Sequence, residues 1–229
     1  MLAGAAFFSP RRLHFSVVSA RPPSVHGCVM QFHPGAKPEF VRHVESRLAQ
    51  LRAELPVVLP PAPAAITLEI GCGHGHFLAR YAEAHPERFC LGIDILNDRL
   101  ERAMKKRNRA GLTNLHFHKA EATELLECLP PGISFAEVFL LFPDPWPKKR
   151  HHKNRLVRHD FLATLATRMV PGGKFYFRTD HAEYFVTGHE VLATHPAWRL
   201  DPAAPWPFEE ATVFQLKAPA YQSLVAIVN

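Results

Sequence analysis

The sequence predicts an α/β fold in which a mostly parallel sheet of about seven strands carries helices on both faces. Two observations favour it. Beyond residue 64, short apolar runs alternate with helical patterns, and this rhythm indicates βαβ units. The first of these strands ends in a turn with glycines at alternate positions, and ligands of such sheets bind at the carboxyl ends of the strands.

The composition is typical of one large folded domain. The chain has 229 residues, of which 47% are hydrophobic and 21% charged, and a chain of this size buries about 70% of its surface on folding. Its four cysteines include no C-x-x-C pair, which argues against a zinc ribbon or a thioredoxin motif and favours a reducing, cytoplasmic compartment. The 15 histidines show no metal-ligand spacing, so we expect no metal.

The sequence also leads to expectations about membrane segments and about the N-terminal part of the chain. No apolar run reaches the roughly 18 residues of a membrane span, so we expect no membrane segment. Residues 1–37 hold four basic residues and no acidic one, and we expect a disordered extension or one created by a start upstream of Met30. A secretory signal peptide would carry its basic residues before the first apolar run, whereas here they follow it, so the alternative is an organelle transit peptide. Residues 38–229 are expected to form the folded domain.

The first element of that domain is a helix from Pro38 to about Leu55, because apolar residues recur on one of its faces at helical spacing. A proline-rich linker, residues 56–63, is expected to follow. The later strands are expected at residues 65–70, 89–95, 115–119, 136–142, 174–178 and 223–229. The later helices are expected at residues 77–84, 98–110, 123–129, 159–170 and 182–194.

The turn after the first strand reads L-E-I-G-C-G-H-G over residues 68–75. Gly71, Gly73 and Gly75 let the backbone turn tightly and approach a ligand closely. A dinucleotide enzyme would need G-x-G-x-x-G, but residue 76 is histidine, which disfavours a nicotinamide-linked oxidoreductase. The observed spacing, with Glu69 two residues earlier, suits S-adenosylmethionine (SAM), which has a charged amino acid end and no phosphate. A glycine-rich turn without a ligand is the alternative.

Acidic residues follow three later strands. Asp94 ends the second strand, where a carboxylate can accept hydrogen bonds from ribose hydroxyls or serve as a helix cap. Glu121 follows the third strand and either reaches an adenine amino group or caps the next helix. Asp180 follows the fifth strand and either binds a base or caps a helix. Near the end of the chain, Thr212 and Gln215 either close over the pocket or belong to an ordinary loop.

The most specific segment is L-F-P-D-P-W-P-K-K-R-H-H-K-N-R, residues 141–155. Prolines on both sides hold Asp144 in extended backbone and so aim its carboxylate. Trp146 offers a face for stacking a base, and the cations from Lys148 onward offer phosphate contacts. Residues 99–109 and 148–158 each hold six basic residues, so the net charge of +6 is gathered in patches that suit a polyanion. A stiff loop with solvated cations is the alternative.

Taken together with L-G-I-D, R-T-D and T-V-F-Q, these motifs resemble the SAM-dependent tRNA (guanine-N7)-methyltransferases, a family of class I methyltransferases, over residues 38–229. The resemblance implies methyl transfer from SAM to N7 of a guanine in the tRNA variable loop, giving 7-methylguanosine. It implies a SAM site lined by Glu69, Asp94, Glu121 and Asp144, with Asp144 as the catalytic residue. It also implies RNA contacts by Lys148, Asp180 and the segment from Thr212 to Gln215.

The chain departs from that family at three positions: Asp94 and Glu121 reverse the usual Glu and Asp, and Gln215 replaces the usual Glu. Guanine N7 already carries a lone pair, so the reaction needs alignment rather than a base. Our hypothesis is that Asp144 accepts a hydrogen bond from the guanine and stabilises the charge that develops on it. Another RNA methyltransferase, a protein or small-molecule methyltransferase and a non-catalytic RNA-binding relative remain alternatives. We expect a monomer or homodimer without an obligate protein partner.

Overall fold

The computed structural model describes residues 37–210, 215–216, 218 and 220–229. The expectations for residues 1–36 and for Thr212 therefore lie outside the described residues. The elements, in chain order, are α1 (Pro38–Val58), β1 (Ala64–Ile70), α2 (His76–Ala84), β2 (Cys90–Asp94), α3 (Asn97–Arg109), β3 (Leu115–Lys119), α4 (Ala122–Cys128), β4 (Ile133–Leu141), η1 (Lys149–Asn154), α5 (His159–Ala166), β5 (Met169–Thr179), α6 (Ala182–Thr194), β6 (Trp198–Leu200) and β7 (Gln222–Val228).

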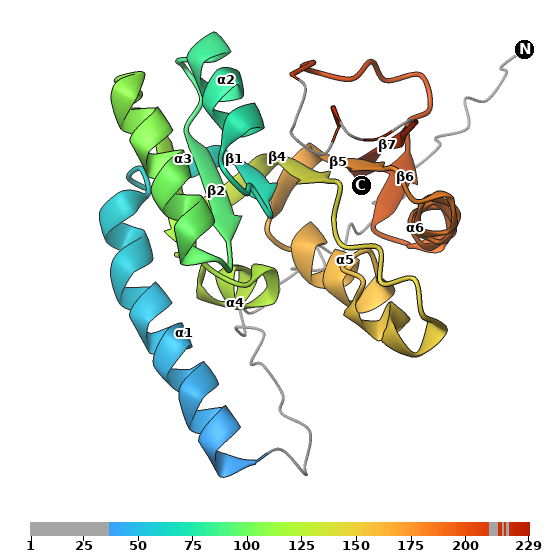
Figure 1. Ribbon diagram of the computed structural model, residues 1–229, viewed down its shortest axis with the longest axis horizontal. Coiled ribbons are helices and arrows are strands. Elements are labelled where there is room, and N and C mark those ends of the chain that lie inside the picture. The colour runs from blue at the N-terminus through green and yellow to red at the C-terminus, as the bar shows by residue number, and fades with distance from the viewer. Residues whose placement is uncertain (1–36, 211–214, 217, 219) are drawn as a thin grey trace, which may run out of the picture.

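One seven-stranded sheet forms the centre of the molecule (Figure 1), and its strand order is β3-β2-β1-β4-β5-β7-β6. The five strands from β1 to β5 pair in parallel, whereas β7 is antiparallel to both β5 and β6. The predicted mostly parallel sheet is thus confirmed. Because the parallel strands point the same way, the loops after β1, β2, β3, β4 and β5 gather at one edge, which places the motifs read from the sequence together.

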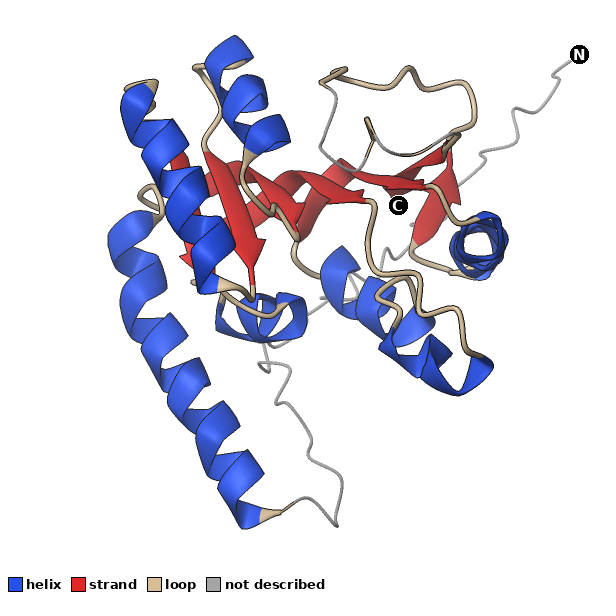
Figure 2. Cartoon of the chain, in the orientation of Figure 1, coloured by secondary structure: helices blue, strands red, loops and turns tan. Residues whose placement is uncertain are grey.

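Helices cover both faces of the sheet (Figure 2). On one face α1, α4, α5 and α6 pack their apolar sides against the strands and form the larger hydrophobic core. On the other face α2 and α3 form a second core, which the segment from Ala204 to Phe208 extends. Among the described residues, no helix has both the length and the apolar character needed to cross a membrane.

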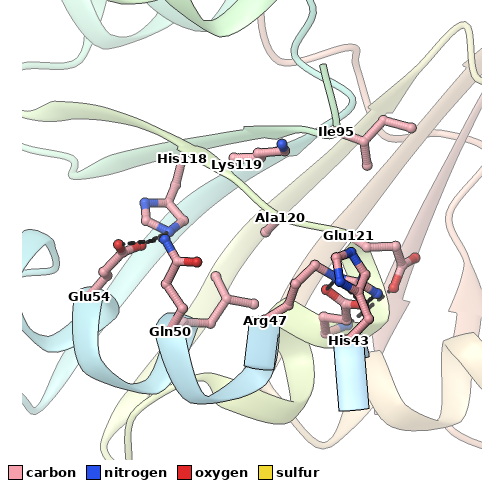
Figure 3. Close-up of a pocket in the computed structure, with 11 residues that line it drawn as sticks. His43, Arg47, Gln50, Glu54, Ile95, His118, Lys119, Ala120 and Glu121 are labelled. Carbon is pink, nitrogen blue, oxygen red and sulfur yellow. Dashed lines mark hydrogen bonds and ion pairs between the residues drawn. The ribbon is translucent and has the colours of Figure 1, made fainter. Parts of the chain in front are cut away.

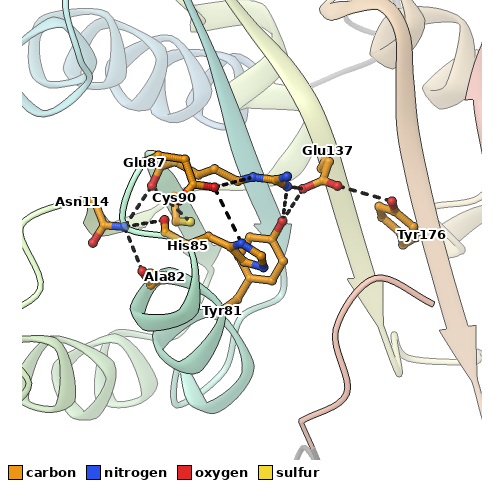
Figure 4. A network of polar contacts seen from close by, with 9 residues as sticks. Tyr81, Ala82, His85, Glu87, Cys90, Asn114, Glu137 and Tyr176 are labelled. Carbon is orange, nitrogen blue, oxygen red and sulfur yellow. Dashed lines mark hydrogen bonds and ion pairs between the residues drawn. The ribbon is translucent and has the colours of Figure 1, made fainter. Parts of the chain in front are cut away.

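A network of polar side chains ties α2 to the middle of the sheet (Figure 4). Glu137 of β4 accepts hydrogen bonds from Tyr81, Arg88 and Tyr176, the last at 3.3 Å. Burial and the nearby carboxylate raise the pKa of both tyrosine hydroxyls well above their usual range. The hydroxyls therefore stay protonated and act as donors, which leaves the half-buried Glu137 carboxylate satisfied.

Several element boundaries differ from the sequence prediction. The prediction of a linker at residues 56–63 is wrong for its first three residues, because α1 continues through Pro56 to Val58. Pro56 lies in the last turn, where its missing N–H removes only one bond, and Leu55 and Leu59 on either side are buried. The helix expected to reach residue 170 ends at Ala166, because Met169 already pairs with Phe135 of β4.

Candidate active site

A cavity of about 280 Å³ opens at the carboxyl edge of the sheet. Four loops contribute to it: Gly71 follows β1, Asp94 ends β2, Glu121 follows β3 and Asp144 follows β4. Trp146 completes the group. The structure therefore brings together five of the residues that the sequence singled out, although they span 76 positions of the chain.

The glycine turn has two distinct parts. Gly71, Gly73 and Gly75 have φ values of 72°, 54° and 65°, which L side chains rarely adopt. At Gly71 and Gly73 an added Cβ would meet no atom within 4 Å, so open space lies beside the backbone there. At Gly75 it would lie 2.5 Å from the Phe117 ring. The first two glycines thus leave room for a ligand, whereas the third allows α2 to pack closely on the sheet.

Glu69 is the penultimate residue of β1, just before the turn, and is 3% exposed. Burial raises the pKa of its carboxyl to about 8, although a backbone hydrogen bond from Leu78 partly opposes this effect. Its Oε2 atom has no hydrogen-bond partner among the described residues. An unpartnered buried carboxyl oxygen is costly, and a cationic group of a ligand would satisfy it.

Asp94 connects the turn to the second strand. Its Oδ2 accepts a 3.0 Å hydrogen bond from the Gly73 N–H, and its Oδ1 accepts a 2.9 Å bond from the Leu96 N–H. The Nη1 atom of Arg99 lies 3.7 Å from Oδ2. Each carboxylate oxygen can accept a second hydrogen bond, so Asp94 holds the turn and still offers acceptors to ribose hydroxyls.

Glu121 serves as the N-cap of α4, one of the two roles considered from the sequence. Its Oε2 accepts bonds from the N–H groups of Thr123 and Glu124, at 2.8 and 3.2 Å. The same residue also lines the cavity. Capping fixes the carboxylate in place, and its other oxygen remains able to accept a hydrogen bond from a ligand.

A second cavity of about 580 Å³ adjoins the first, and Ile95, Ala120 and Glu121 line both. Helix α1 forms its outer wall (Figure 3), where Arg47 bonds to Glu124 and Glu54 lies 3.2 Å from Nε2 of His118. The Arg47–Glu124 ion pair and the Glu54–His118 contact thus dock α1 beside Glu121. The charged groups of this wall are largely engaged with one another.

The loop carrying Asp144 is fixed at both ends. Phe142 and Trp146 have φ values of 49° and 46°, a left-handed backbone that is costly for such residues and is often found at functional sites. The Phe142 N–H donates to the Arg178 carbonyl at 2.8 Å. Arg155 donates from Nε to the Pro145 carbonyl at 2.8 Å. Asp144 itself is exposed and lines the cavity.

Arg155 was missed as a site residue. It is 4% exposed, its guanidinium lies 4.9 Å from the Tyr184 ring centre, and Nη1 donates to Thr187 at 3.2 Å. In the sequence it appears as one more cation of the basic block. Only the fold distinguishes this buried cation, which supports the loop, from the exposed ones.

The remaining candidates lie outside the cavity lining. Lys148 is exposed at the start of η1, and the exposed Lys149, Arg150 and Lys153 continue the basic block. Asp180 is also exposed, and α6 is capped by His181, whose Nδ1 accepts from the Tyr184 N–H. The capping alternative for Asp180 is therefore wrong.

Gln215 faces Arg178 and Tyr221 rather than the cavity. Its Oε1 accepts from Arg178 at 3.4 Å, and its Nε2 donates to the Tyr221 hydroxyl at 3.1 Å. A neutral amide suits this position because it can accept from one neighbour and donate to the other.

The donor set of the cavity suits an organic cation with a ribose better than a metal. Across the described ranges, no group of three or more His, Cys, Asp or Glu side chains is arranged to hold a metal ion. The cavity instead combines an open glycine turn, a carboxylate at the end of β2 and a capped carboxylate after β3. Asp144 and Trp146 line the same cavity, and the exposed basic block begins two residues after Trp146 in the chain.

Comparison with known proteins gives two kinds of similarity. Residues 63–214 match the family model named "Putative methyltransferase". The tRNA (guanine-N(7)-)-methyltransferase of Syntrophotalea carbinolica is 44% identical over 128 residues, which cover 56% of this chain and 54% of that protein. The enzyme of the same name from Treponema pallidum is 36% identical over 157 residues, covering 69% of this chain and 63% of that protein. The matches thus span about half to three fifths of these relatives.

Among solved structures, the crystal structure of TrmN from Thermus thermophilus superposes with a TM-score of 0.53. The sequences are 17% identical, and the match covers 80% of this chain and 48% of that chain. At this identity the similarity shows the fold alone.

Proposed function

This chain belongs to the tRNA (guanine-N7)-methyltransferase family of class I methyltransferases, and from that premise we propose that it transfers a methyl group from SAM to N7 of a guanine in tRNA. We further propose that the guanine lies in the variable loop and that the product is 7-methylguanosine. The observation that carries the proposal is the single cavity in which the glycine turn and two fixed carboxylates meet Asp144 and Trp146.

Four groups of this chain would hold the cofactor. The open side of the turn at Gly71 and Gly73 receives it without steric conflict. Asp94 accepts from the ribose, Glu121 accepts from the adenine amino group, and the unpartnered Oε2 of Glu69 faces the ammonium charge. When bound, the cofactor supplies a methyl group on a positively charged sulfur.

Asp144 and Trp146 would act on the guanine. N7 carries an in-plane lone pair, so no proton is removed before attack, and positioning is the main task of the site. Trp146 stacks on the base, while Asp144 accepts a hydrogen bond from N1–H or the amino group. The methylated ring becomes cationic, and the negative charge of Asp144 stabilises it as it forms.

The exposed cations would hold the RNA around this site. Lys148, Lys149, Arg150 and Lys153 follow the catalytic loop directly, and α3 adds exposed Arg102, Lys105 and Arg109. Cations in these positions contact phosphates and set affinity and orientation rather than sequence. An unstacked loop guanine is also easier to reach than one in a helix.

The proposal is tested by incubating the full chain with labelled SAM and unmodified tRNA and then analysing the nucleosides. We expect 7-methylguanosine confined to the variable loop. Label in another base would favour a different RNA methyltransferase, and SAM binding without transfer would favour a non-catalytic relative. We propose a cytoplasmic location, in keeping with the buried free cysteines of the described chain, and action as a monomer or homodimer.

A further inference from the structure

Arg178, the penultimate residue of β5, is 4% exposed and touches five residues of the chain between Trp206 and Ser223. Its two Nη atoms form a forked pair with Glu209 at 3.0 and 2.9 Å. Its Nε donates to Ser223 at 2.8 Å, and Nη1 reaches Gln215 at 3.4 Å. A planar guanidinium with a fork of donors is suited to such a set of contacts.

Two aromatic rings flank the same guanidinium. Its Cζ atom lies 3.8 Å from the ring centre of Trp206 and 4.7 Å from that of Tyr221. Trp206 in turn packs against Phe139 and Tyr176 of the central strands. Arg178 therefore joins both ends of the connection between β6 and β7 to the sheet.

The same residue also supports the catalytic loop. Its carbonyl accepts the 2.8 Å hydrogen bond from Phe142, the residue whose left-handed backbone begins that loop. The Tyr221 ring, held beneath Arg178, packs edge-on against the Phe142 ring at 5.8 Å. Phe142 lines the cavity beside Asp144.

We infer that Arg178 is a positioning residue: its side chain clamps Trp206, Glu209 and Tyr221 to the sheet and, through Tyr221 and Phe142, holds the Asp144 loop in its strained conformation. The inference rests on the proposed function for its catalytic consequence but not for the clamp itself. A strained backbone persists only where its surroundings over-determine it. The backbone carbonyl of Arg178 contacts Phe142 directly, and its side chain holds Tyr221, whose ring makes the second contact.

The activity test compares Arg178→Met and Tyr221→Leu with wild type. We expect each variant to lower kcat with tRNA by about tenfold or more, because a small misplacement of a positioning group has a large effect on rate. The dissociation constant of SAM should stay within about twofold, since Arg178 does not line the cavity. The double variant should lose little more than either single one, because both changes break the same linkage.

Three variants serve as controls. Arg178→Lys keeps the charge opposite Glu209 but loses the fork and the stacking, so we expect it to stay well below wild type. Arg199→Met removes an exposed arginine of neighbouring β6, and Ile133→Val mildly destabilises the far end of β4. Both should keep wild-type kcat. Full activity of Arg178→Met or Arg178→Lys, or an equal loss in Ile133→Val, would overturn the inference.

A second readout does not depend on catalysis. Hydrogen exchange of a peptide covering residues 141–146 should speed up by about tenfold or more in Arg178→Met, while a peptide of β3 should be unchanged. Unchanged exchange at residues 141–146 would refute the clamp. If wild type made no 7-methylguanosine but exchange responded as expected, the proposed function would fail and the clamp would stand.

Discussion

The Gly73 N–H donates a 3.0 Å hydrogen bond to Oδ2 of Asp94, which joins the glycine turn to the end of the second strand. Two motifs separated by 21 positions thus form one unit. The carboxylate both shapes the turn and faces the cavity. Changes at Asp94 therefore affect the conformation of the turn as well as contact with a ribose.

Asp94→Asn keeps the shape of the side chain but leaves only one acceptor oxygen for Gly73 and Leu96. We expect the dissociation constant of SAM to rise by about tenfold or more, because charge-assisted hydrogen bonds contribute about 1.5–3 kcal/mol. Isothermal titration with SAM measures the effect. Asp98→Asn, an exposed change in the first turn of α3, is the control, and equal SAM affinity in both variants would contradict the role of Asp94.

Asp144→Asn tests the catalytic residue. The amide can still accept a hydrogen bond but no longer opposes the positive charge on the methylated guanine. We expect kcat to fall by about 100-fold, as for the loss of one electrostatic contact to a transition state, with SAM affinity nearly unchanged. Single-turnover kinetics separates the two effects. Wild-type turnover in Asp144→Asn would exclude the proposed role.

Glu69 should make both stability and SAM binding depend on pH. Its pKa is raised by burial to about 8, above the ordinary 4.5, so between these values the folded state holds a proton that the unfolded state has lost. The free energy of unfolding then declines as pH rises through this window. Glu69→Gln should show a flatter decline in thermal unfolding at pH 5 to 9.

The affinity for SAM should change with pH in the opposite direction to the free energy of unfolding. An ammonium group near Glu69 favours the ionised carboxylate, so the affinity for SAM should increase as pH rises toward about 8, and binding should release a proton. Calorimetry in buffers with different ionisation enthalpies detects that proton. An equal proton release in Glu69→Gln would assign it to another group.

Gly75→Ala should destabilise the protein more than Gly111→Ala. Both glycines have φ of 65°, but an added Cβ at Gly111 meets open space, whereas at Gly75 it lies 2.5 Å from Phe117. The strained backbone alone costs about 1–2 kcal/mol, and overpacking adds about 1–3 kcal/mol. Urea denaturation of the two variants isolates the packing cost. Equal midpoints would show that Phe117 moves aside freely.

Replacing Lys148, Lys149, Arg150 and Lys153 by glutamine should weaken tRNA binding in a salt-dependent way. Each phosphate contact contributes about 0.7–0.9 to the slope of log affinity against log salt, so the slope should fall by up to about 3. Fluorescence anisotropy at several salt concentrations measures it. A glutamine variant of exposed Arg199 should keep the wild-type slope, and an unchanged slope in the fourfold variant would place the RNA elsewhere.

The features that sequence could predict are those determined locally. The glycine turn and the prolines around Asp144 carry their own backbone restrictions, and hydrophobic periodicity places β3 at Leu115–Lys119 and α6 at Ala182–Thr194, as expected. The βαβ pattern makes the strands parallel, and parallel strands bring Gly71, Asp94, Glu121 and Asp144 to one edge. None of these steps needs knowledge of distant contacts.

The features that sequence missed depend on such contacts. Arg155 is a buried support only because Tyr184 and Pro145 lie around it. The hydrogen bonds of Gln215 with Arg178 and Tyr221 also join residues that lie apart in the chain, so the sequence does not predict them. Strand β6 has three residues and pairs with β7, so no local sequence pattern predicts it.

The position of β7 sets an order for folding during synthesis. This strand follows every other described strand along the chain, yet it lies between β5 and β6. While a ribosome is still translating the preceding segments, β5 presents an open edge and β6 has no neighbour to bond. The nascent chain can complete its parallel half early, but the edge of β5 that β7 covers stays available for wrong pairing until β7 emerges.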